Sequence, residues 1–119
     1  MKKAFLILVM SLGCMSLNAQ NDYYARQAQS HRNDAEYYVK QAQGYDRDVE
    51  YYTREAMGHL RDAAYYQRQK QYEQARSALR RAKAAIERAD DNRRRADNAR
   101  SNAKSYIRRA DDALGNIKK

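Results

Sequence analysis

Small and aromatic residues recur along the first half of the chain in a heptad pattern that predicts a long helix. One column holds mostly alanine, and a second column three residues further on holds mostly tyrosine. The steps between the two columns alternate between three and four residues from Tyr24 to Tyr66 without a fault, which is the spacing of a coiled-coil seam. The residues that we expect in this seam are Tyr24, Ala28, Tyr38, Ala42, Tyr45, Val49, Tyr52, Ala56 and Tyr66.

Four tyrosine pairs repeat every 14 residues, which is two heptads. The second tyrosine of each pair falls in the seam, and the first lies beside it at the edge that faces water. Gly44 and Gly58 stand where an earlier repeat has Ser30, and they indicate either local flexibility or close contact with a partner backbone. The pairs are Tyr23-Tyr24, Tyr37-Tyr38, Tyr51-Tyr52 and Tyr65-Tyr66.

The second half of the chain carries another heptad seam, which is built mainly from alanine. Asn92 interrupts it, either as a polar residue that fixes the register or as part of a cap, Asp90-Asp91-Asn92, that begins a new helix. The seam column with the most regular spacing is Ala75, Ala82, Ala89, Ala96, Ala103 and Ala110.

The two seams are out of phase, because the first register would continue through Lys70 and Ser77 while the second begins at Ala75. A turn at 69–74 would resolve the difference, although the segment has no Gly, Pro or Asn to favour one. We therefore predict an all-α fold of long heptad-repeat helices, either an antiparallel helical hairpin or an extended coiled coil with one continuous rod. The two arms are expected at 20–68 and 75–119.

Residues 1–19 have the features of an export signal. Lys2 and Lys3 precede a largely apolar run, and Leu17-Asn18-Ala19 fits a cleavage site for a signal peptidase. The signal predicts a periplasmic or secreted protein without a membrane-spanning helix in its mature part. The only cysteine, Cys14, is either removed with the signal or becomes the lipidated first residue of an outer-membrane lipoprotein.

Composition argues against a large globular core. The chain has no Pro and no Trp, and its apolar content is mostly Ala and Tyr, so self-association is expected. Residues 21–62 hold 6 basic and 8 acidic residues, whereas residues 63–119 hold 16 basic and 7 acidic ones. A possible contact surface for anionic polymers is Arg80, Arg81, Arg88, Arg93, Arg94 and Arg95.

The sequence contains no pattern of residues typical of an active site. His31 and His59 take the place of tyrosine in the first seam, too far apart along one helix to share a metal ion. With no clustered ligands, no glycine-rich phosphate loop and no pattern of nucleophile and base, we expect no enzyme activity, no metal site and no cofactor.

The alanine column of residues 75–119, together with Ser11-Leu12-Gly13-Cys14 and the terminal Lys118-Lys119, resembles the alanine-zipper outer-membrane lipoproteins of the murein-lipoprotein type. The resemblance implies a lipid on Cys14 and a link from Lys119 to peptidoglycan. Ser11 departs from the cleavage box of that family, and the tyrosine pairs have no counterpart in it.

These patterns together predict an exported, non-enzymatic coiled-coil protein with a structural or binding role in the periplasm or cell envelope. The alternatives are a lipid-anchored tether between outer membrane and peptidoglycan, and a basic helical binder of anionic polymers. The expected partners are a second copy of the chain, an envelope polymer or another helical protein, and the export signal argues against nucleic acid.

Overall fold

The computed structural model describes the backbone of residues 2–118 and the side chains of residues 18–118. It contains two long helices, α1 (Lys2–Arg68) and α2 (Tyr72–Gly115). No strand is present between residues 2 and 118. The prediction of an all-α fold with long helices is therefore confirmed.

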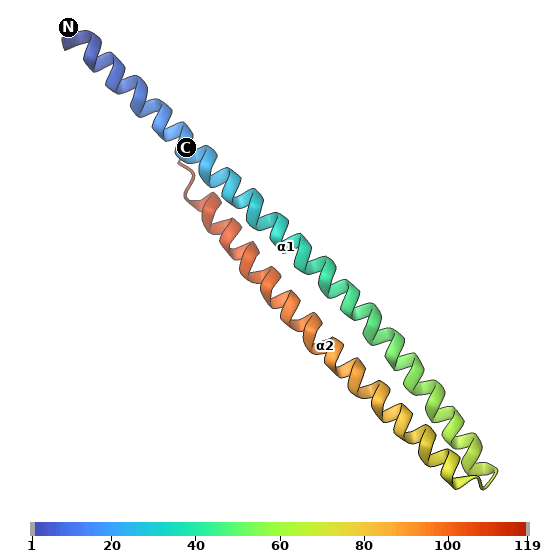
Figure 1. The fold of residues 1–119 in the computed structure, drawn as a ribbon. Coiled ribbons are helices and arrows are strands. Elements are labelled where there is room, and N and C mark those ends of the chain that lie inside the picture. The colour runs from blue at the N-terminus through green and yellow to red at the C-terminus, as the bar shows by residue number, and fades with distance from the viewer. Residues whose placement is uncertain (1, 119) are drawn as a thin grey trace. The chain divides into compact units, whose positions relative to one another are not determined.

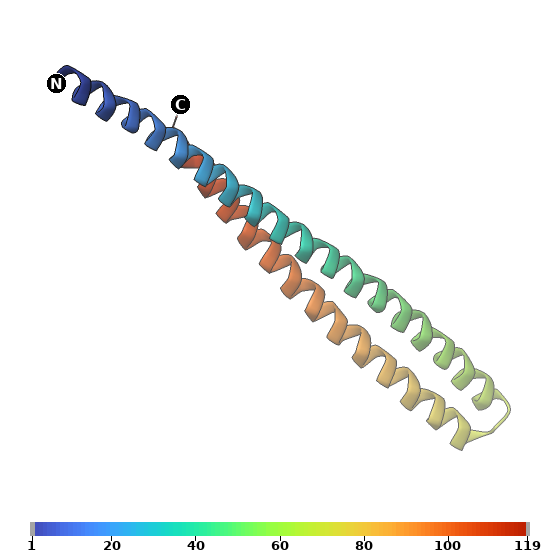
Figure 2. The ribbon, with the colours of Figure 1, turned by 45° about the horizontal axis from the view of Figure 1, so that its top comes forward.

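The two helices contribute to two compact units. One consists of Tyr38–Ser101 and holds the end of α1, the connection and the start of α2; we call it the hairpin unit. The other consists of Met1–Tyr37 with Asn102–Lys119, and we call it the terminal unit. Within each unit, the segments of α1 and α2 lie side by side and run in opposite directions (Figures 1 and 2).

Alanine forms the interior of both units. Every buried side chain among residues 18–118 is an alanine, and all of them stand at positions of the two predicted heptad seams. The rings of the tyrosine column are half-buried beside them, from Tyr24 to Tyr66. Large rings next to methyl groups fill a narrow seam, because the alanines let the two backbones approach closely.

The connection between the helices forms a Schellman motif at the end of α1. The backbone N–H of Gln71 donates to the carbonyl oxygen of Tyr66 at 2.8 Å, and that of Lys70 donates to Gln67 at 3.0 Å. These two bonds satisfy carbonyl groups that the end of a helix leaves without partners. Lys70 occupies the left-handed position of the motif with a φ of 58°, a conformation that usually selects glycine.

The connection lies inside the segment 69–74, and α2 begins at Tyr72 within it. The backbone N–H of Ala75 donates to the carbonyl oxygen of Gln71 at 3.0 Å, which is the first backbone bond of the new helix, so Gln71 stands at its N-cap position. Because α1 ends at Arg68, the alternative of a single continuous rod is not found.

Asn92 lies inside an uninterrupted α2, so the alternative of a helix break at Asp90-Asp91-Asn92 is wrong. Its amide nitrogen donates to the carbonyl oxygen of Arg88, one turn earlier, at 2.9 Å. This bond gives the polar side chain a partner within its own helix, and Asn92 is half-buried in the seam.

Among the described residues, neither helix contains a stretch long and apolar enough to cross a membrane.

Replacing Lys70 with glycine should stabilise the protein. A non-glycine residue in the left-handed region costs about 1 kcal/mol, so Lys70→Gly should raise the free energy of unfolding by about 0.5–1 kcal/mol. Urea unfolding followed by circular dichroism at 222 nm measures this change. Gln69→Gly, one residue earlier and outside the left-handed position, is the matched control and should not stabilise. A loss of stability in Lys70→Gly would contradict the role of the Schellman motif.

Candidate functional site

The predicted seam residues all lie between or beside the helices. The alanines are buried, apart from Ala110, which is half-buried together with Val49 and the tyrosines. The buried alanines of the predicted set are Ala28, Ala42, Ala56, Ala75, Ala82, Ala89, Ala96 and Ala103, and the half-buried tyrosines are Tyr24, Tyr38, Tyr45, Tyr52 and Tyr66. The seam is thus occupied by the protein's own side chains, and a binding surface has to lie outside it.

The large apolar side chains are on the outside of the helices. The first tyrosine of each pair is more than half exposed, as Tyr51 is at 60% and Tyr65 at 53%. Leu60 (45%), Leu79 (50%) and Ile86 (46%) are also exposed in the hairpin unit. Small side chains inside and large ones outside reverse the usual distribution.

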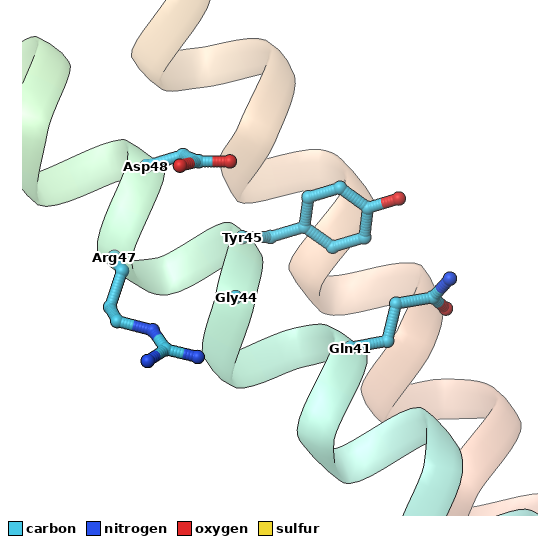
Figure 3. Close-up of a pocket in the computed structure, with 5 residues that line it drawn as sticks. All are labelled: Gln41, Gly44, Tyr45, Arg47 and Asp48. Atoms are coloured by element: carbon cyan, nitrogen blue, oxygen red, sulfur yellow. The ribbon is translucent and has the colours of Figure 1, made fainter.

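In the hairpin unit the two exposed tyrosines of α1 belong to a column in which rings alternate with glycine. The column is Gly44, Tyr51, Gly58 and Tyr65, at steps of seven residues, and we call it the outer column. A hollow of about 550 Å³ surrounds Gly44 and is lined by Gln41, Gly44, Tyr45, Arg47 and Asp48 (Figure 3). Figure 3 shows that Arg47 and Asp48 leave α1 on opposite sides of Gly44.

The outer column separates charges of opposite sign. On the side nearer to α2 lie Asp48, Glu55 and Asp62, which we call the acidic column. On the other side lie Arg47, Arg54 and Arg61, which we call the basic column. The heptad explains this order, because a residue four positions after the outer column points toward the seam and a residue three positions after it points away.

One member of the acidic column, Glu55, lies near arginines of α2 in the hairpin unit. A hollow of about 220 Å³ between the helices is lined by Glu55, His59, Ala84, Ala85, Arg81 and Arg88. The guanidinium of Arg88 also lies over the ring of Tyr52, 5.8 Å from its centroid. Acidic residues of α1 therefore offset part of the positive charge of α2 along this edge.

The six arginines of the predicted anionic-polymer surface divide into two groups. Arg93 pairs with Asp90 at 3.0 Å and Arg94 with Asp91 at 3.3 Å, each within α2. The other four have no ion pair within 4 Å among the described residues, namely Arg80, Arg81, Arg88 and Arg95. An external anion would meet this second group without competition from an ion pair, whereas at Arg93 and Arg94 it would compete with a neighbouring aspartate.

One ion pair joins α1 to α2 in the hairpin unit. The guanidinium of Arg100 donates to the carboxylate of Asp46 and also to Asp97 within α2. The hydrogen bond to Asp46 is the main cause that raises the pKa of Arg100 above its ordinary value. Arginine is protonated at neutral pH with or without this partner, so the pair does not change the charge of Arg100. Its effect is to favour the alignment of α1 and α2 that brings Asp46 beside Arg100. Sequence reasoning missed this pair, and aligning the columns beside the two seams in opposite directions would have found it.

The terminal unit contains two further contacts between segments distant in sequence. The side-chain amide nitrogen of Asn21 donates to the carbonyl oxygen of Lys118 at 2.9 Å, and the backbone N–H of Lys118 donates to the side-chain oxygen of Asn21 at 3.1 Å. The ring centroids of His31 and Tyr106 lie 6.0 Å apart, and Nδ1 of His31 is buried without a hydrogen-bond partner. Polar groups thus join α1 to the segment after α2, while a histidine replaces a tyrosine between the helices.

Two predicted residues, Cys14 and Lys119, lie outside the residues whose side chains are described, so their lipidation and cell-wall link stay predictions. Within residues 18–118, no three His, Cys, Asp or Glu side chains gather where they could hold a metal ion.

His31→Phe should stabilise the protein, because it removes a buried nitrogen that lacks a partner and keeps a ring against Tyr106. We expect a gain of about 1 kcal/mol in the free energy of unfolding, measured by urea titration at pH 8. His59→Phe is the control, since the ring of His59 borders an open hollow, and it should change stability by less than about 0.5 kcal/mol. Equal changes in the two variants would contradict this interpretation.

Comparisons with known proteins give no relative for this chain: no protein-family description, no curated protein and no solved structure matches it.

Proposed function

We propose that this protein is an exported, non-enzymatic coiled-coil protein of the periplasm or cell envelope, with a structural or binding role. The observation that carries the proposal is the reversed distribution of apolar side chains. Alanine fills the interior, while tyrosine, leucine and isoleucine stand exposed along the helices. Apolar groups exposed to water favour association, because the free energy falls when a partner covers them.

The predicted cleavage site is compatible with the contacts of the terminal unit. Asn21 of α1 exchanges two hydrogen bonds with Lys118, three residues after the end of α2. Cleavage after Ala19 would leave Gln20 as the first residue and would keep this contact.

The mass of the intact protein recovered from its native host tests the proposal. We expect a chain that starts at Gln20 in the periplasmic or secreted fraction. A chain that keeps Met1 and stays in the cytoplasm would contradict export.

The same measurement tests the lipid-anchored alternative. A chain that starts at acylated Cys14 in the membrane fraction would favour a tether of the murein-lipoprotein type. In that case Lys119 would be the next residue to examine, by digestion of purified peptidoglycan and mass analysis of the released fragments.

A second candidate function, binding of anionic envelope polymers, is favoured by the arginines that have no ion pair. Arg81→Gln with Arg88→Gln should lower the salt concentration at which the protein leaves a heparin column, because each lost contact reduces counter-ion release. Arg93→Gln with Arg94→Gln removes the same charge from paired arginines and should have a smaller effect. Equal shifts in the eluting salt concentration for both double variants would indicate that heparin binding depends only on the net charge of the protein.

A further inference from the structure

We infer that the outer column of the hairpin unit binds the same column of a second copy of this chain, with the two α1 helices parallel and in register. This inference rests on the proposed function, since it names the partner that covers the exposed tyrosines. Its occupant is a second copy because the charges beside the column complement themselves and the exposed rings lack cover within the chain.

The glycines of the outer column have no role in packing within the chain. A Cβ placed on Gly44 or on Gly58 would meet no atom within 4 Å, and both residues have negative φ. Glycine inside a helix costs about 1 kcal/mol relative to alanine, so the two glycines destabilise α1. No packing contact within the chain compensates for this cost. Space at these positions is useful only to something outside the chain.

The tyrosines of the same column are the rings that a second copy would cover. Tyr51 and Tyr65 are 60% and 53% exposed, and each stands seven residues after a glycine. In a parallel pair that is in register, residues with the same number lie at the same height, so the two Tyr51 rings meet each other and the two Tyr65 rings do the same. These pairs of rings alternate along the contact with the open positions at Gly44 and Gly58.

The charges beside the outer column select the parallel orientation. In a parallel pair related by a two-fold axis along the helices, the basic column of each copy faces the acidic column of the other. Arg47, Arg54 and Arg61 then meet Asp48, Glu55 and Asp62. In an antiparallel pair, like columns would face each other, and arginine would meet arginine. Like charges that face each other across a helix contact are unfavourable, so the basic and acidic columns disfavour the antiparallel pair.

The hairpin itself needs such a partner. A narrow seam of alanine methyl groups buries little apolar area, and short two-helix structures of this kind are marginal on their own. A second copy would cover the rings that the chain leaves exposed, which adds the apolar burial that the alanine interior lacks.

Reversing the basic column tests the inference. We expect the full chain to sediment as a dimer in analytical ultracentrifugation, and we expect Arg47→Glu with Arg54→Glu and Arg61→Glu to weaken the dimer. Six exposed charge pairs turn from attraction to repulsion, so the dissociation constant should rise by roughly 100-fold.

The matched control carries Arg80→Glu, Lys83→Glu and Arg94→Glu, which make the same change in net charge on the outer side of α2. It should dimerise like the unchanged protein. Circular dichroism verifies that both triple variants keep their helix content. An unchanged protein that stays monomeric at about 100 µM, or equal dissociation constants for the two triple variants, would overturn the inference. A monomer that is nevertheless exported and helical would leave the proposed function standing.

Disulfide trapping tests the orientation separately and does not depend on the charge variants. In a background with Cys14→Ala, Gly58→Cys should form a covalent dimer under mild oxidation, because the two copies of residue 58 meet across a parallel, in-register contact. Thr53→Cys, on another face of α1, is the control and should form at least tenfold less dimer in the same time. Equal trapping at both positions would overturn the parallel arrangement.

Discussion

Close approach of two helices over alanine is the constraint on which the rest of this structure depends. Alanine alternates with rings along the seam of α1 and fills most of the seam of α2, which lets the backbones come near each other and leaves room for one ring in every two turns of α1. The second tyrosine of each pair occupies that space, and the first points about 100° away from it around the helix, toward the outside. The exposed rings are therefore ones that this pair of helices cannot bury itself.

The heptad spacing was sufficient to predict the helices and the all-α fold, because a period of three and four residues has no counterpart in a strand. The turn was harder to recognise from sequence. Its signal is a pattern of backbone hydrogen bonds around Lys70, and a lysine in the left-handed region carries no compositional mark of a helix end. The disagreement in phase between the two seams was the better evidence, since it follows from side-chain positions over many turns.

Charge contacts between the helices could not be predicted while the orientation of the arms was open. Asp46 and Arg100 are 54 residues apart, and only an antiparallel arrangement brings their columns together. The ion pairs of Arg93 and Arg94 are different, because each aspartate stands three residues earlier on the same helix and the spacing alone predicts the contact. Net charge for each half of the chain, which the sequence does provide, says that α2 is basic but does not say which arginines remain available to an anion.

Uniform alanine also affects how the two helices find their alignment. A seam in which most rungs are the same methyl group is nearly degenerate: sliding α2 along α1 by one heptad would again set alanine against tyrosine. The positions that break this degeneracy are few, and they include the half-buried Asn92, the joined rings of His31 and Tyr106, and the pair of Asp46 with Arg100. The connection from Gln69 to Gln71 has only three residues, so it leaves little freedom for one helix to slide along the other. Its length therefore determines which residue of α1 lies opposite which residue of α2.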